Sequence, residues 1–145
     1  MNTLLAIANS GAGSSDDEAV EAVVDKLSEG FDVELITTGS PDDLDEALSS
    51  RPELSAIAVL GGDGSAHAVV EALHAADLLG DVTVGLVPLG TGNDFASSLG
   101  LPVDPVEAAG VLVAGQTRHV DLIVDGDGDI VVNAAHIGIG AEAAA

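Results

Sequence analysis

Cysteine, tryptophan and tyrosine are absent from this 145-residue chain, and phenylalanine occurs only twice, at Phe31 and Phe95. Without cysteine the chain has no thiolate metal site, and its redox compartment is not constrained. With so few aromatic rings, alanine, valine and leucine have to fill the core. Hydrophobic residues still make up 47% of the sequence, which is enough for one domain with a normal core.

Basic residues are almost as scarce. Only Lys26, Arg51 and Arg118 stand against 25 acidic residues, and the formal net charge is −22. Nucleic-acid binding and electrostatic docking on anionic membranes both need a cationic surface, so this composition argues against them. It resembles the composition of proteins from salt-accumulating halophiles, where screening by salt offsets the self-repulsion. We therefore interpret the charge as an adaptation to the solvent.

The sequence also lacks an apolar run near the ~20 residues that a membrane-spanning helix requires. The first eight residues carry no positive charge before their apolar part, so we expect a first strand there and not a signal peptide. These observations make the cytoplasm the expected location.

One stretch organises the rest of the chain. The apolar residues 56–60 predict a short buried strand, and residues 66–79 predict a helix with apolar positions at helical spacing. Between them lies a glycine-rich turn that exposes backbone N–H groups beside a helix start, an arrangement that suits phosphate. Its carboxylate suggests a divalent cation or a proton-transfer function. A purely structural tight turn is the alternative. The turn reads Gly61-Gly62-Asp63-Gly64-Ser65.

Strands and helices alternate along most of the chain. Apolar runs predict strands at residues 4–8, 31–36, 56–60 and 81–87, and helical periodicity predicts helices at 17–29, 42–49, 66–79, 95–99 and 105–114. Continuously apolar strands that alternate with helices are typical of a parallel sheet covered on both faces. The predicted fold is therefore a layered α/β domain.

Polar loops follow each of the first four predicted strands. They begin near Asn9, Thr38, Gly61 and Pro88, and three of them contain several glycines. Because parallel strands end at the same edge of a sheet, we expect all four loops to meet there, where such sheets bind their ligands. This convergence favours the phosphate site over the structural turn.

The pattern changes after Gly115. Residues 117–124 and 130–136 predict two strands, and the Asp/Gly run at 125–129 predicts the hairpin turn between them. A calcium loop of the EF-hand type is the alternative, but its twelfth position falls on His136 where glutamate is needed. We therefore favour the plain turn.

Taken together, the loops resemble those of the diacylglycerol kinase catalytic-domain superfamily. The resemblance lies in the glycine-rich turn at 61–65, in Asn9-Ser10-Gly11, in Thr38 and in the more specific string Pro88-Leu89-Gly90-Thr91-Gly92-Asn93-Asp94-Phe95. It implies a parallel-sheet layered fold like that of NAD kinases and diacylglycerol kinases. It further implies a nucleotide-binding α/β domain over residues 1–116 and a short antiparallel start of a β-rich second domain over residues 117–145.

The resemblance also implies an activity. Members of the family use ATP to phosphorylate a lipid hydroxyl, with Mg²⁺ at the phosphates, and Asp63 would be the catalytic and metal-binding carboxylate. Phosphoryl transfer of this kind needs positioned phosphates and neutralised charge more than covalent chemistry. The residues implied to contact the nucleotide are Asn9, Ser10, Thr38, Gly61, Gly62, Asp63, Gly64, Ser65, Gly90, Thr91, Gly92 and Asn93.

Three departures from the family pattern leave alternatives open. Ser65 stands where the family pattern has threonine, Ala68 where it has glutamate and Ser97 where it has arginine. The resemblance also implies that most of the second domain is missing, so we expect a truncated chain. The alternatives are the ATP-binding half of a lipid kinase, an NAD kinase-like enzyme acting on a soluble substrate, and a non-catalytic regulatory remnant. The expected partners are ATP and a lipid at a membrane surface, with a homodimer as a further alternative and no nucleic acid.

Overall fold

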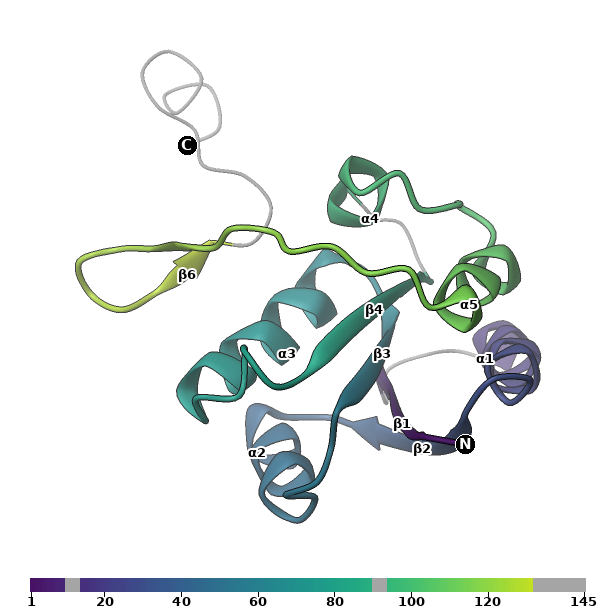
Figure 1. Ribbon diagram of the computed structural model, residues 1–145, viewed down its shortest axis with the longest axis horizontal. Coiled ribbons are helices and arrows are strands. Elements are labelled where there is room, and N and C mark those ends of the chain that lie inside the picture. Colours follow the sequence, from purple (N-terminus) through teal and green to yellow (C-terminus); the bar gives the residue numbers. More distant parts are fainter. Residues whose placement is uncertain (10–13, 90–93, 132–145) are drawn as a thin grey trace.

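The computed structural model describes residues 1–9, 14–89 and 94–131, and every structural statement below concerns these residues. They form a layered α/β fold around a four-stranded parallel sheet (Figure 1). The strands follow the order β2-β1-β3-β4 across the sheet. Their bounds are Thr3–Asn9 for β1, Asp32–Thr38 for β2, Ala56–Gly61 for β3 and Thr83–Pro88 for β4. The predicted parallel sheet is confirmed.

Helices cover both faces of this sheet. On one face α1 (Ser14–Leu27) lies beside α5 (Pro105–Ala114), and on the other α2 (Pro41–Ser49) packs with α3 (Asp63–Ala75) (Figure 1). The short helix α4 (Asp94–Ser98) contacts α3 and β4. Helices on both faces explain why the central strands are continuously apolar.

The two central strands, β1 and β3, supply both halves of the core. Successive side chains of a strand point to opposite faces, so Leu5 and Ile7 join the cluster under α2 and α3, while Leu4 and Ala6 join the cluster under α1 and α5. Among the described residues, every buried side chain in these clusters is aliphatic. This confirms the prediction of a core built from small aliphatic residues.

Two glycines permit α5 to lie close to its neighbours. A Cβ atom at Gly85 in β4 would stand 2.4 Å from Leu112 Cδ2, and a Cβ at Gly30 would stand 3.0 Å from Val113 Cγ1. A side chain at Gly85 would have to displace the end of the Leu112 side chain, and one at Gly30 would require Val113 to shift slightly. Glycine at these two positions therefore favours the close packing of α5 on β4 and beside α1.

The bounds of α3 differ from the prediction. The helix begins at Asp63, three residues before Ala66, and ends at Ala75 instead of residue 79. It ends because Asp77 adopts a left-handed φ of 58°, and the N–H of Leu78 donates to the carbonyl of Leu73 at 2.9 Å in a Schellman arrangement. Because the helix begins at Asp63, Gly64 and Ser65 belong to its first turn and not to the loop before it.

The last described part of the chain contains less strand than predicted. Residues 117–122 form no strand, and pairing is limited to β5 (Ile123–Val124) and β6 (Ile130–Val131), which are antiparallel. The predicted hairpin turn is confirmed: it joins the antiparallel strands β5 and β6, and Asp125 Oδ1 accepts hydrogen bonds from the N–H groups of Asp127 and Asp129, both at 2.9 Å. Residues 132–136 of the second predicted strand lie outside the described residues. The division into domains at residue 116 stays a prediction.

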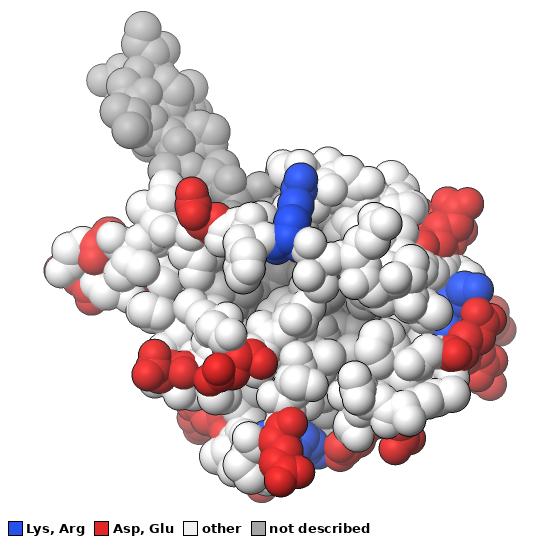
Figure 2. Space-filling model, in the orientation of Figure 1, with Lys and Arg blue, Asp and Glu red and all other residues white. Residues whose placement is uncertain are grey.

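The surface reflects the unbalanced composition. Asp and Glu side chains lie around the periphery of the face shown in Figure 2. Two of the three basic residues are in ion pairs: Lys26 Nζ lies 2.7 Å from Glu29 Oε2, and Arg51 bonds Glu34. In the part of the chain that the structure describes, we find no helix with the length and hydrophobicity to span a bilayer.

Candidate functional site

The carboxyl ends of the four parallel strands meet at one edge of the sheet. Asn9 at the end of β1 is in register with Thr38 at the end of β2, and Gly61 at the end of β3 is in register with Pro88 at the end of β4. The predicted convergence is confirmed for these strand ends. Strand β1 has β2 on one side and β3 on the other, so the chain reverses direction across the sheet there. Such a switch point is the usual ligand-binding crevice of open α/β sheets.

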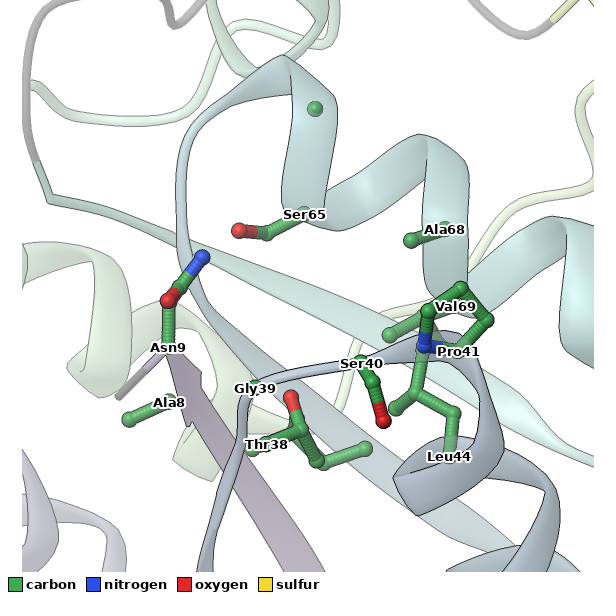
Figure 3. Close-up of a pocket in the computed structure, with 12 residues that line it drawn as sticks. Ala8, Asn9, Thr38, Gly39, Ser40, Pro41, Leu44, Ser65, Ala68 and Val69 are labelled. Carbon is green, nitrogen blue, oxygen red and sulfur yellow. The ribbon is translucent and has the colours of Figure 1, made fainter. Parts of the chain in front are cut away.

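A cavity of about 200 Å³ opens at this point, between the end of β1, the start of α2 and the first turns of α3 (Figure 3). One part of its wall is apolar and another part carries amide and hydroxyl groups. The lining residues are Ile7, Ala8, Asn9, Thr38, Gly39, Ser40, Pro41, Leu44, Gly64, Ser65, Ala68 and Val69.

Three predicted nucleotide-binding side chains line this cavity from three different elements: Asn9 from β1, Thr38 from β2 and Ser65 from α3. In Figure 3 the side chains of Asn9 and Ser65 point toward the same space between the end of β1 and α3. An amide and two hydroxyls can donate and accept hydrogen bonds. This set suits the hydroxyl and phosphate oxygens of a nucleotide.

The N-terminus of α3 forms another part of the wall. Its N-cap residue is Gly62, which makes no side-chain hydrogen bond to the first turn, while Gly64 and Ser65 of that turn line the cavity. The first N–H groups of a helix have no partner within the helix and carry a partial positive charge. They are therefore suited to accept an anionic group in the cavity.

The fold constrains the glycines at positions 61 and 64 differently. A Cβ atom at Gly61 would lie 2.7 Å from Ser65 Oγ, so glycine at this position leaves room for the hydroxyl that lines the cavity. A Cβ at Gly64 would meet nothing within 4 Å, and the φ of Gly64 is not in the left-handed region. Among the described residues, nothing near position 64 requires glycine. A ligand that approaches the backbone would supply the reason.

Asp63 is the first residue of α3 and is half-buried. It precedes the lining residue Gly64 without lining the cavity itself. Within residues 1–9, 14–89 and 94–131, no three His, Cys, Asp or Glu side chains gather into a metal-binding group. A Mg²⁺ ion bound by Asp63 would therefore take most of its ligands from phosphate oxygens and water, as Mg²⁺ commonly does. The catalytic and metal-binding functions of Asp63 stay predictions.

The lining residues that the structure describes carry no formal charge. The guanidinium of Arg51 is held by Glu34, with Nε 3.1 Å from Oε2, and this hydrogen bond lowers the pKa of Glu34 and raises that of Arg51. Lys26 lies on α1, on the opposite face of the sheet from α2 and α3, and pairs with Glu29. Because none of the described lining residues is basic, backbone N–H groups and a metal ion would have to balance a phosphate charge within the lining.

Besides Ile7 and Ala8 of β1, six lining residues were not predicted from the sequence. Three of these residues follow β2. The sequence of the helix start, Ser40-Pro41-Asp42-Asp43, could have indicated them, because Ser40 Oγ accepts a hydrogen bond from the N–H of Asp43. The others lie on the inner faces of α2 and α3, where helical spacing from Gly64 and Ser65 leads to two of them. These residues are Gly39, Ser40, Pro41, Leu44, Ala68 and Val69.

Several predicted site residues lie outside the described residues, namely Ser10, Gly90, Thr91, Gly92 and Asn93. The last described residue before this second glycine-rich loop is Leu89, whose N–H donates to the carbonyl of Gly61 at 3.3 Å. The second loop therefore begins beside the first. The nucleotide contacts of these five residues stay predictions.

Comparisons with known proteins identify the family of this chain. Residues 3–124 match the family model of the diacylglycerol kinase catalytic domain. A protein of Stenotrophomonas maltophilia named "Probable lipid kinase YegS-like" is 32% identical over 123 residues, which are 81% of this chain and 40% of that protein. A "Diacylglycerol kinase" of Mycobacterium tuberculosis is 34% identical over 116 residues, which are 78% of this chain and 36% of that protein.

A solved structure shows the same likeness. The crystal structure of a diacylglycerol kinase from Bacillus anthracis aligns with a TM-score of 0.75 and 25% sequence identity, covering 89% of this chain and 48% of that one. The chain thus spans less than half the length of the relatives it matches here.

Proposed function

The chain belongs to the diacylglycerol kinase catalytic-domain family, and from this premise we propose that it is the nucleotide-binding part of an ATP-dependent lipid kinase. Its cavity would hold Mg²⁺-ATP, and the acceptor would be a lipid hydroxyl such as that of diacylglycerol. The match to this family favours the lipid-kinase alternative over an NAD kinase-like enzyme.

The observation that carries this proposal is the meeting of Asn9, Thr38 and Ser65 around one cavity at the uncapped N-terminus of α3. A purely structural turn does not require polar side chains from three distant segments to meet at one cavity. Their meeting at the strand switch point therefore favours a binding site. The open space beside Gly64 supports the same conclusion, because a side chain there would enter the region where we place the phosphates.

The proposed chemistry follows from this arrangement. The N–H groups of the first turn of α3 would bind phosphate oxygens, and the hydroxyls of Thr38 and Ser65 would orient the nucleotide. A Mg²⁺ ion, when bound, would neutralise phosphate charge that no lysine or arginine in the described lining can offset. Asp63, at the start of the same helix, would hold that ion or assist the acceptor hydroxyl.

The lipid, the membrane surface at which it would be met and the cytoplasmic location belong to the same proposal. So does a high working salt concentration, which is supported by the net charge of −22 and the acidic periphery of the molecule. We propose that the 145-residue chain binds nucleotide but turns over little substrate, because relatives of more than twice its length carry further sequence. Binding is therefore the test.

Isothermal titration with Mg²⁺-ATP in molar KCl tests the proposal, with the Asp63→Asn variant as the control. We expect the wild-type chain to bind, and the variant to bind more weakly in the presence of Mg²⁺ because it has lost the carboxylate. If the folded wild-type chain shows no heat of binding at ATP concentrations up to the millimolar range, the proposal of a nucleotide site is overturned. A non-catalytic scaffold would then be the better interpretation.

A further inference from the structure

The wall of the cavity that faces α3 is formed by residues 38–41, where the chain leaves β2 and enters α2. Figure 3 shows the hydroxyl of Thr38 directed toward the space that the lining residues surround. Pro41 occupies the first turn of α2, where its fixed φ suits the helix start. This short segment has to keep one conformation if Thr38 is to meet a ligand.

Two hydrogen bonds join this wall to one residue behind it. The N–H of Gly39 donates to Asp43 Oδ2 at 2.8 Å, and the N–H of Asp43 donates to Ser40 Oγ at 3.4 Å. Asp43 is exposed and does not itself line the cavity. The pair of bonds resembles a capping box, in which a helix start and the segment before it satisfy each other.

On the basis of the proposed nucleotide site, we propose that Asp43 is a positioning residue for that site. Its carboxylate accepts a hydrogen bond from the N–H of Gly39. This bond fixes the conformation of residues 38–41, so that the side chain of Thr38 faces the ligand. The same bond occupies an N–H group that could otherwise bind an anion, and two carboxylates stand in the first turn of α2. Phosphate is therefore directed to α3, and the wall of α2 receives an uncharged part of the nucleotide.

The chain offers a closely matched control. Asp42 lies in the same first turn of α2, carries the same charge and is equally exposed. Among the described residues, it makes no hydrogen bond to residues 38–41. Asp42→Ala thus changes the net charge and the helix dipole as Asp43→Ala does, without releasing the wall.

The experiment is a titration of Mg²⁺-ATP into the wild-type chain and four variants, each shown to be folded by circular dichroism at the titration temperature. We expect Asp43→Ala to weaken binding by about 5-fold, as the net loss of one exposed hydrogen bond that positions the wall predicts. Asp42→Ala should change it less than about 2-fold. Asp43→Asn should restore most of the affinity, because its amide oxygen can still accept from Gly39.

The fourth variant, Asp104→Ala, separates positioning of the wall from a loss of stability alone. It removes the cap of α5, whose residues do not line the cavity, so it should lower the thermal midpoint while leaving the affinity nearly unchanged. The inference is overturned if Asp43→Ala binds like the wild type, if Asp42→Ala or Asp104→Ala weakens binding equally, or if Asp43→Asn fails to restore it. A folded wild-type chain that binds no nucleotide overturns the proposed function, and the inference with it.

Discussion

The helices α3 and α5 begin in different ways. The N-terminus of α5 is closed by Asp104, whose Oδ1 accepts from the N–H of Val106 at 2.8 Å and of Glu107 at 3.1 Å, and Pro105 has no N–H to satisfy. The N-cap of α3 is Gly62, which has no side chain to close the helix start, and no side-chain hydrogen bond among the described residues caps it. The capped end stands away from the cavity, and the uncapped end forms part of its wall.

The two helix starts show that a helix N-terminus can either stabilise the fold or bind a ligand. A capped start contributes about 1 kcal/mol to the stability of a helix and leaves little for a ligand to bind. An uncapped start lacks this stabilisation, but its N–H groups can bind a ligand. In this chain the uncapped start coincides with the switch point of the sheet, where a ligand can reach it.

The largest expected effect comes from giving α3 a cap like that of α5. Gly62 has a φ of −99° and a ψ of −164°, a conformation that aspartate can adopt. We expect Gly62→Asp to raise the free energy of unfolding by a few tenths of a kcal/mol and to weaken Mg²⁺-ATP binding by on the order of 100-fold, because the new carboxylate competes for the N–H groups and repels phosphate.

Gly80→Asp is the matched control, since it adds the same charge at an exposed glycine beyond the other end of α3. It should leave the affinity almost unchanged. Equal weakening by both variants would mean that net charge, and not the start of α3, governs binding.

A smaller change at the same helix start is Gly64→Ala. The fold has open space for the new methyl group, so stability should rise by about 0.5 kcal/mol through helix propensity. Binding of Mg²⁺-ATP should weaken about tenfold, because the methyl group stands where the phosphates would approach the backbone. Gly110→Ala in α5, whose Cβ would lie 3.5 Å from Lys26 Cε, should bring a similar gain in stability. If Gly64→Ala keeps the affinity of Gly110→Ala, no ligand approaches the backbone at position 64.

The converse change removes the cap of α5. Asp104→Ala should lower the free energy of unfolding by about 1 kcal/mol, measured by urea denaturation, and Asp104→Asn should lower it less because asparagine also caps well. Neither variant should alter nucleotide binding. A loss of affinity in Asp104→Ala that persists in the fully folded protein would remove the distinction between the two helix starts.

The smallest expected effect concerns pH. The hydrogen bond from Arg51 holds the pKa of Glu34 below its ordinary value, so this ion pair stabilises the fold above that value and its contribution is lost as the pH falls through the lowered pKa. We expect Arg51→Gln to reduce the part of the acid destabilisation that arises in this range, measured by thermal unfolding between pH 5 and pH 2. Because both side chains are on the surface, molar KCl should diminish the difference. An unchanged pH profile in Arg51→Gln at low salt would contradict it.

The sheet could be predicted from the sequence because its strands are short apolar runs that stay buried on both faces, as β1 and β3 show. The start of α3 was misplaced because its apolar periodicity begins at Ala66, whereas the helix itself begins directly after Gly62. Residues 117–122 have a suitable strand composition, yet no strand forms there, because a strand also needs a partner that local sequence does not specify.

The candidate site shows the same division. Glycine and polar residues after Asn9, Thr38 and Gly61 indicated the edge of the sheet, and the register of the strands brings these positions together. The apolar part of the wall, with Leu44 and Val69, was not predicted, because it depends on how α2 and α3 pack over the sheet. Sequence patterns indicated which loops could form a binding site, and tertiary packing determined which side chains surround the cavity.

Backbone amide chemical shifts during a titration with Mg²⁺-ATP test the central claim most directly. Gly64 and Ser65 report on the uncapped start of α3, and Val106 and Glu107 report on the capped start of α5 within the same molecule. The account predicts that the amide signals of Gly64 and Ser65 move saturably while those of Val106 and Glu107 stay in place. Saturable binding that leaves Gly64 and Ser65 unmoved would contradict it.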